Sequence, residues 1–302
     1  ETFYRTSITN NTSLSFSKGG DGYNIRSSMS LIDKGGIITN SDQKTINMSL
    51  NASYDISDKF TVNVNVNYQD RTTRNDPDQG YANLASNMNQ WWQRQLDFDR
   101  LKEYERAGQI VSWNIRGPRD ARPLYWDMPD FQPFENLKHQ FKNSAYGKLG
   151  GVYTFNEKFN VVAEIRSTFH NFAQDDRATT KSLLDPASYS EYQRRYNKEH
   201  YFGMLNYKDN FLDGDLDVDA SLGGEIITTD FKGLSASTAG DLTIPEFYNL
   251  AGSQDPVNAS TSISQRETRG TFLKASFGFK NTLYLDGSYR LDWSSTANPN
   301  EN

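Results

Sequence analysis

The sequence predicts an all-β fold, an antiparallel transmembrane β-barrel of which this chain supplies a part. Apolar and polar residues alternate with period two in several segments, and short and long connections alternate between those segments. Aromatic residues make up 13% of the chain although its mean hydropathy is only −0.78. A barrel accounts for both values, because only every second residue of a membrane-spanning strand faces lipid.

Composition excludes several other classes of protein. A transmembrane helix needs about 20 consecutive apolar residues, and the apolar runs here are far shorter. The aromatic content argues against disorder, and the net charge of −6 argues against a nucleic-acid partner. The chain has no cysteine, so a thiol nucleophile and a cysteine-based zinc site are excluded.

The strand period is clearest over residues 60–68, where three valines share one face and three asparagines share the other. Residues 215–222 and 283–292 alternate in the same way. In a large barrel one face meets lipid and the other lines a wet or plugged interior. The sequence therefore predicts a polar lumen lining that includes Asn63, Asn65, Asp215, Asp217, Asp219, Asp286 and Arg290.

Ten strands are predicted from this alternation. They span residues 11–18, 23–33, 45–55, 59–71, 138–155, 158–172, 197–209, 215–230, 266–279 and 282–293. Short connections at 19–22, 56–59, 156–157, 210–214 and 280–281 alternate with long ones at 34–44, 72–137, 173–196 and 231–265. Outer-membrane barrels sort their connections in this way, with tight turns in the periplasm and long loops outside.

The direction of the first and last strands places both chain ends on the long-loop side. A complete bacterial barrel with an even number of strands has both ends in the periplasm. We therefore expect residues 1–302 to form a single partial barrel domain, with strands missing at both ends and any plug domain outside this chain.

Four segments carry a family resemblance, and their order along the chain strengthens it. They are 30–42, the hairpin 47–68, Pro245-Glu-Phe-Tyr-Asn-Leu250, and 269–295, which ends in Arg290, Asp292, Ser294 and Ser295. The chain resembles the SusC/RagA group of TonB-dependent outer-membrane transporters. The resemblance implies the middle part of a 22-stranded barrel that imports glycans or oligopeptides. It also implies a SusD-like surface lipoprotein as partner, contact with TonB through a plug absent from this chain, outer-membrane lipid around the barrel, and no cofactor.

The long connection 72–137 contains a segment, 80–108, whose apolar residues approximate helical spacing. Aromatic residues gather in and after it: Trp91, Trp92, Trp113, Tyr125 and Trp126. Exposed tryptophan and tyrosine side chains make platforms for sugar rings or protein contacts. The alternative is that these aromatics pack the loop against the barrel rim.

No catalytic or metal motif appears in the sequence. The acidic run Asp213–Asp219 lacks the glycine and glutamate of a calcium-binding loop, so a strand with lumen-facing aspartates explains it better. His139, His170 and His200 show no ligand spacing. We expect no enzyme activity. Two rivals to import remain: a structural subunit of a larger outer-membrane assembly, and a ten-stranded surface protease, against which the chain-end topology argues.

Overall fold

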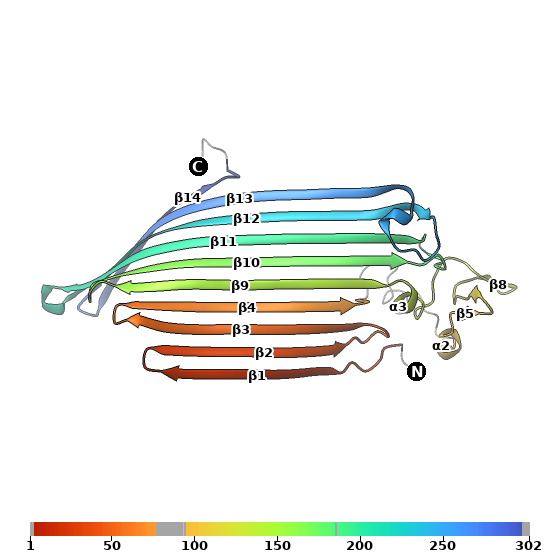
Figure 1. The fold of residues 1–302 in the computed structure, drawn as a ribbon, viewed down its shortest axis with the longest axis horizontal. Helices are drawn as coiled ribbons and strands as arrows, with labels where there is room; N and C mark the ends of the chain where they lie inside the picture. The colour runs from red at the N-terminus through yellow and green to blue at the C-terminus, as the bar shows by residue number, and fades with distance from the viewer. Residues whose placement is uncertain (1–2, 77–92, 94, 185, 298–302) are drawn as a thin grey trace.

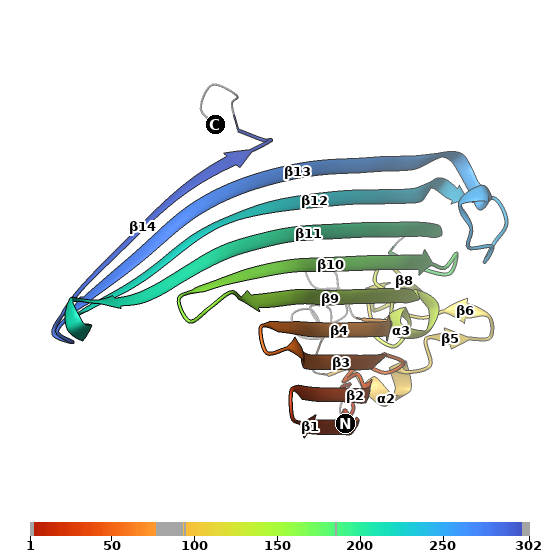
Figure 2. The same cartoon turned by 60° about the vertical axis from the view of Figure 1, so that its left-hand side comes forward.

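The computed structural model describes residues 3–76, 93, 95–184 and 186–297. Ten of its strands form one antiparallel sheet in which chain order is also spatial order. Figures 1 and 2 show this sheet as a single curved layer with the long connections gathered at one end. The strands are β1 Thr9–Gly20, β2 Tyr23–Gly35, β3 Asp42–Ser57, β4 Phe60–Arg74, β9 Lys138–Thr154, β10 Phe159–Ala178, β11 Ser188–Phe211, β12 Leu216–Leu242, β13 Ser253–Phe279 and β14 Leu283–Ser294.

The connection between β4 and β9 holds the small elements. These are α2 Phe98–Leu101, β5 Glu105–Arg106, β6 Gln109–Ile110, β7 Ile115–Gly117, β8 Asp120–Pro123 and α3 Gln132–Glu135. Two short 3-10 helices, η2 Leu212–Gly214 and η3 Leu250–Gly252, lie in the connections on either side of β12. In the part of the chain that is described, no helix is both long and apolar enough to cross a membrane.

All ten predicted strands are confirmed, but β10, β11, β12 and β13 are longer than their alternation indicated. Most of 231–265, predicted as a loop, continues the ladder between β12 and β13. The reason is that polar residues occupy both faces of the sheet in this region, as at Lys232, Ser235 and Gln265. A strand with water on both sides has no period-two contrast, although its backbone pairing is unchanged.

The helix predicted over 80–108 is not supported in its described part. Residues 80–92 lie outside the described residues, and so do Trp91 and Trp92. Beyond them only α2 is helical, and β5 and β6 then pair around a turn at Ala107 and Gly108, both with positive φ. A glycine turn of this kind ends the helical path that the apolar spacing suggested.

The sheet has one apolar and one polar face, as the register shows. Directly opposed residues share a face. Val64 lies opposite Ala52 and Leu149, whereas its neighbour Asn65 lies opposite Asn51 and Lys148. Large apolar side chains on the apolar face remain exposed: Leu149 is 52% exposed, Leu222 59% and Leu273 48%. An uncovered apolar face on a single-layer sheet is the arrangement that a lipid-facing wall requires.

The apolar band crosses the sheet obliquely. On each strand the band ends where the apolar face first carries a charged residue, counted away from the short turns. This residue is Asp70 on β4 and Arg269 on β13. The row of paired residues through Arg269 reaches β4 at Val64, six residues before Asp70. Six residues along a strand span about 20 Å, and the five strand spacings from β13 to β4 span about 24 Å. The ratio of these two lengths corresponds to strands tilted by about 40° from the membrane normal. This tilt is typical of membrane barrels.

Candidate functional site

Six of the seven residues predicted to line the lumen lie on the polar face of the sheet. Asn63 and Asn65 do so on β4, and Asp217 and Asp219 on β12. On β14, Asp286 and Arg290 lie opposite the polar-face residues Ser276 and Phe272 of β13.

Asp215, the seventh, lies between η2 and β12 at the short-turn end of the β12–β13 ladder. Its carbonyl accepts from the backbone N–H of Lys280 at 2.7 Å, and its carboxylate pairs with Lys280 Nζ at 3.4 Å.

A chain of ion pairs and hydrogen bonds crosses the polar face from β9 to β14. We call it the ionic ladder, and it consists of Lys148, Glu164, Arg166, His200, Glu225, Arg290 and Asp292. On β9 and β10, Lys148 Nζ lies 3.4 Å from Glu164 Oε1 and Arg166 Nε donates to Glu164 Oε2 at 2.9 Å. Glu164 therefore has a cationic partner on its own strand and on the next.

His200 connects the two halves of the ionic ladder. Its Nδ1 lies 3.5 Å from Arg166 Nη1, which can only donate, and its Nε2 lies 2.8 Å from Glu225 Oε2. The neutral tautomer with the proton on Nε2 satisfies both contacts. Arg290 then binds Glu225 and pairs with Asp292 at 2.7 Å. The ionic ladder thus links side chains of five strands, β9, β10, β11, β12 and β14, and passes across β13 between the last two.

An aromatic pair lies beside the ionic ladder on the same face. The rings of Phe202 and Phe272 stack with centroids 5.9 Å apart and an interplanar angle of 19°. Gly223, on the strand between them, makes this possible, since a Cβ there would lie 2.3 Å from the ring of Phe272. The guanidinium groups of Arg166 and Arg290 lie over these rings at 5.5 and 5.9 Å. The sequence did not indicate this pair, because it depends on the register of three strands.

The β4–β9 connection has its own apolar core at the outer end of the sheet. Trp113, Trp126, Met128 and Phe131 form it, and Tyr104 packs edge-on against Phe131 at 5.3 Å. Leu184 of the β10–β11 connection also packs against it. Trp113 and Trp126 are only 8% and 7% exposed, so they stabilise the loop and are not platforms for a ligand.

Tyr125 differs from its neighbours, because it is 53% exposed. It follows the β7–β8 hairpin, whose tip carries the exposed Arg116, Arg119 and Arg122. Asp120 pairs with Arg122 at 2.7 Å. The hairpin therefore presents a basic and aromatic surface at the outer end of the molecule. Its sequence signal was the repeat of arginine at every third position, Arg116, Arg119 and Arg122, next to Gly117, Pro118 and Pro123, which the sequence analysis did not use.

Polar contacts join the β4–β9 connection to the neighbouring β10–β11 connection. Asp127 is 1% exposed and accepts hydrogen bonds from Ser182 Oγ at 2.6 Å and from the backbone N–H of Leu183 at 2.7 Å. Lys181 Nζ lies 2.8 Å from Glu105 Oε2. The two loops therefore pack as one unit.

Glu246 ties the β12–β13 connection to the same unit. Its Oε1 accepts from the hydroxyls of Thr179 and Thr180, each at 2.8 Å, and Tyr248 donates to its other oxygen. Partial burial raises the pKa of Glu246, but the hydrogen bonds from Tyr248, Thr180 and Thr179 outweigh burial and hold the pKa below its usual range. Burial and the bond to Glu246 raise the pKa of Tyr248 to about 12.

These bonds predict a pH dependence of the loop contact. A carboxylate whose pKa is lowered by folding contributes its full stabilisation above its ordinary pKa of 4.5 and loses it as pH falls through the lowered value. We expect hydrogen exchange of residues 179–184 to speed up on acidification through that window. Glu246→Gln is expected to remove the part of the pH response that belongs to Glu246. An unchanged response in this variant would contradict the assignment.

Within the described residues, no cluster of three or more histidine, aspartate or glutamate side chains could hold a metal ion. The described residues thus form a sheet with one apolar and one polar face, and three connections pack against one another at the end away from the short turns.

Comparison with solved structures matches this architecture. The chain is similar to the RagAB peptide transporter, with a TM-score of 0.76 and 17% identity over 98% of this chain and 33% of that one. The RagAB peptide importer in the open-open state gives 0.75 and 17% over 97% and 32%. The outer-membrane transporter YddB from Escherichia coli gives 0.57 and 9% over 96% and 34%.

The chain spans about a third of the length of these structures. No protein-family model matches it, and no curated protein matches its sequence. At these identities the likeness concerns the fold. The predicted fold, part of an antiparallel outer-membrane-type β-barrel, is confirmed, and the resemblance to the SusC/RagA group holds at the level of architecture.

Proposed function

We propose that this chain forms the middle part of the wall and outer mouth of a TonB-dependent importer in a bacterial outer membrane. The observation that carries the proposal is the uncovered sheet, with an apolar band tilted by about 40° on one face and the ionic ladder on the other. The fold shared with outer-membrane transporters supports it. The polar face would line the lumen, and TonB would act through a plug outside this chain.

The cargo we propose is an oligopeptide or a glycan. Solved structures similar to this chain include a peptide transporter, and the sequence resemblance includes importers of both classes. Such cargo needs capture at the mouth, where the interlocked loops form a single surface. A SusD-like surface lipoprotein would cover that surface. The chain would act by binding and guiding cargo and not as an enzyme.

Uptake by the full-length protein in its host tests this proposal. Cells are given labelled oligopeptides and, separately, labelled oligosaccharides, with and without TonB. We expect TonB-dependent uptake of one class, and co-purification of a lipoprotein with the barrel. Tyr125→Ala is expected to reduce uptake several-fold by removing an exposed contact at the mouth. Tyr54→Ala is the matched control, because Tyr54 is 58% exposed at the opposite end of the sheet.

One feature favours a second function, a structural subunit of a larger outer-membrane assembly. Arginine and tyrosine, which the β7–β8 hairpin exposes, are residue types enriched in protein–protein interfaces. In that case the barrel would purify in a stable complex with other barrels, and neither cargo class would enter through it. That result would replace the import proposal.

A further inference from the structure

A groove crosses the apolar face of the sheet from β9 to β13. Its floor is a row of small residues that lie opposite one another on successive strands: Gly151, Ala163, Gly203 and Gly224. The cavity has a volume of about 1320 Å³ and is lined mainly by apolar side chains. Its walls stand on the face that carries the exposed leucines, and its lining also includes Glu164, Phe202 and Glu225, which belong to the opposite face.

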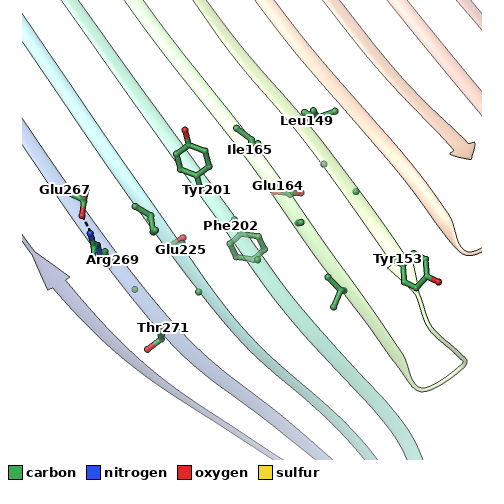
Figure 3. A pocket seen from close by; sticks show the side chains of 18 of the residues that line it. Leu149, Tyr153, Glu164, Ile165, Tyr201, Phe202, Glu225, Glu267, Arg269 and Thr271 are labelled. Carbon is green, nitrogen blue, oxygen red and sulfur yellow. Dashed lines mark hydrogen bonds and ion pairs between the residues drawn. The ribbon is translucent and has the colours of Figure 1, made fainter.

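Larger side chains form the two walls of the groove. On the outer side, Leu149, Ile165 and Tyr201 are paired across their strands and lie in a line that leads toward Arg269 (Figure 3). On the inner side, Tyr153 and Val161 are likewise paired. The walls are four residues apart along each strand, about 13 Å between backbone rows.

The groove rises through the apolar band. Since the strands tilt by about 40°, a row perpendicular to them climbs at about the same angle to the membrane plane. It starts beside Val62, two residues from the short-turn end of β4, and reaches the outer boundary of the band at Thr271 and Arg269. Its length over five strands is about 20 Å.

The upper end of the groove is charged and aromatic. Arg269 donates from Nε to Glu267 at 2.7 Å, and Trp293 lies opposite Arg269 on β14. The side chain of Arg269 is 65% exposed, and no hydrogen bond to its two Nη atoms occurs within the described residues. Guanidinium groups bind phosphate strongly, and tryptophan side chains favour the membrane interface.

We propose that this groove binds one acyl chain of an anionic outer-leaflet lipid, with the phosphate of the head group at Arg269. A void in the hydrocarbon region loses dispersion contacts, and an acyl chain restores them. After the wall side chains are subtracted, the width is too small for a helix about 10 Å across. The inference rests on the membrane placement in the proposed function.

Gly203 provides a direct test. A Cβ at Gly203 meets nothing within 4 Å, and its φ is not positive, so Gly203→Leu fills the groove without straining the backbone. Gly147→Leu is the matched control, since Gly147 lies on the same face, is equally open and does not line the groove. The full-length protein and both variants are titrated in detergent with lipid A, and bound lipid is counted by native mass spectrometry.

We expect one lipid A to bind most tightly to the unaltered protein and to Gly147→Leu. In Gly203→Leu it should bind at least about tenfold more weakly, as the loss of about two buried methylene groups implies. Arg269→Gln should bind lipid A no better than zwitterionic phosphatidylethanolamine. Equal binding by all variants, or a crosslink from position 203 to a protein instead of a lipid, would overturn the inference. Failure of the unaltered protein to fractionate with the outer membrane would instead contradict the proposed function.

Discussion

Phe131→Ala is expected to unfold the outer loop core while leaving the sheet intact. Phe131 is 0% exposed and lies between Tyr104 and the residues around Met128. Truncating a fully buried phenylalanine costs about 3–5 kcal/mol through lost burial and the cavity that remains. The loop core is small, so a loss of this size should open it locally. Hydrogen exchange of residues 95–137 measures the effect.

The control for that variant is Phe134→Ala in the short helix α3, which directly follows Phe131. Phe134 is 44% exposed, so its truncation should leave the exchange rates nearly unchanged. Because Leu184 packs on the loop core, exchange in the β10–β11 connection should also speed up in Phe131→Ala. If hydrogen exchange in both connections is as slow in Phe131→Ala as in the unaltered protein, the three loops do not depend on this core.

Glu225→Ala is expected to destabilise the barrel wall by about 2 kcal/mol. Glu225 is the shared partner of His200 and Arg290, and its side chain is 14% exposed. Removing one member of a buried pair costs about 3–5 kcal/mol, and the 43% exposure of the Arg290 side chain lowers this value through solvent screening. Urea unfolding of the full-length protein in lipid vesicles measures the change.

Asp219→Ala is the matched control for the ionic ladder. Asp219 lies on the same strand and the same face, and no ion pair to it occurs within the described residues. Its loss should change the free energy of unfolding by less than about 0.5 kcal/mol. If both variants are equally stable, the ionic ladder does not hold the strands together.

The sequence predicted those parts of the fold in which the two faces of a strand meet different media. Residues 60–68 alternate between valine and asparagine because lipid and a polar interior lie on opposite sides. Beyond the apolar band, as at Lys232, both faces are polar and the strand could not be distinguished from a loop. The alternation of short and long connections was predictable for the same reason, because it depends only on where the strands lie in the sequence.

The candidate sites were less predictable, because they depend on register and loop packing. Gly203 and Gly224 are unremarkable in sequence and form a groove only when paired across strands. Trp113 and Trp126 were chosen as aromatic loop residues, and nothing in their spacing distinguishes a buried ring from an exposed one. Asp217 and Asp219 lie on the face of β12 that their alternation indicated, because their position depends on the strand period alone.

Cysteine scanning of β4 tests the central claim most directly. Residues 1–302 contain no cysteine, and any cysteine elsewhere in the full-length protein is first replaced by serine, so that each single-cysteine variant reports one position only. With the full-length protein in its membrane, a water-soluble maleimide should label positions 63, 65 and 67 and spare 62, 64 and 66. Labelling of both sets alike, or of the valine positions in preference, would contradict a wall whose valine side lies in hydrocarbon and whose asparagine side lies in water.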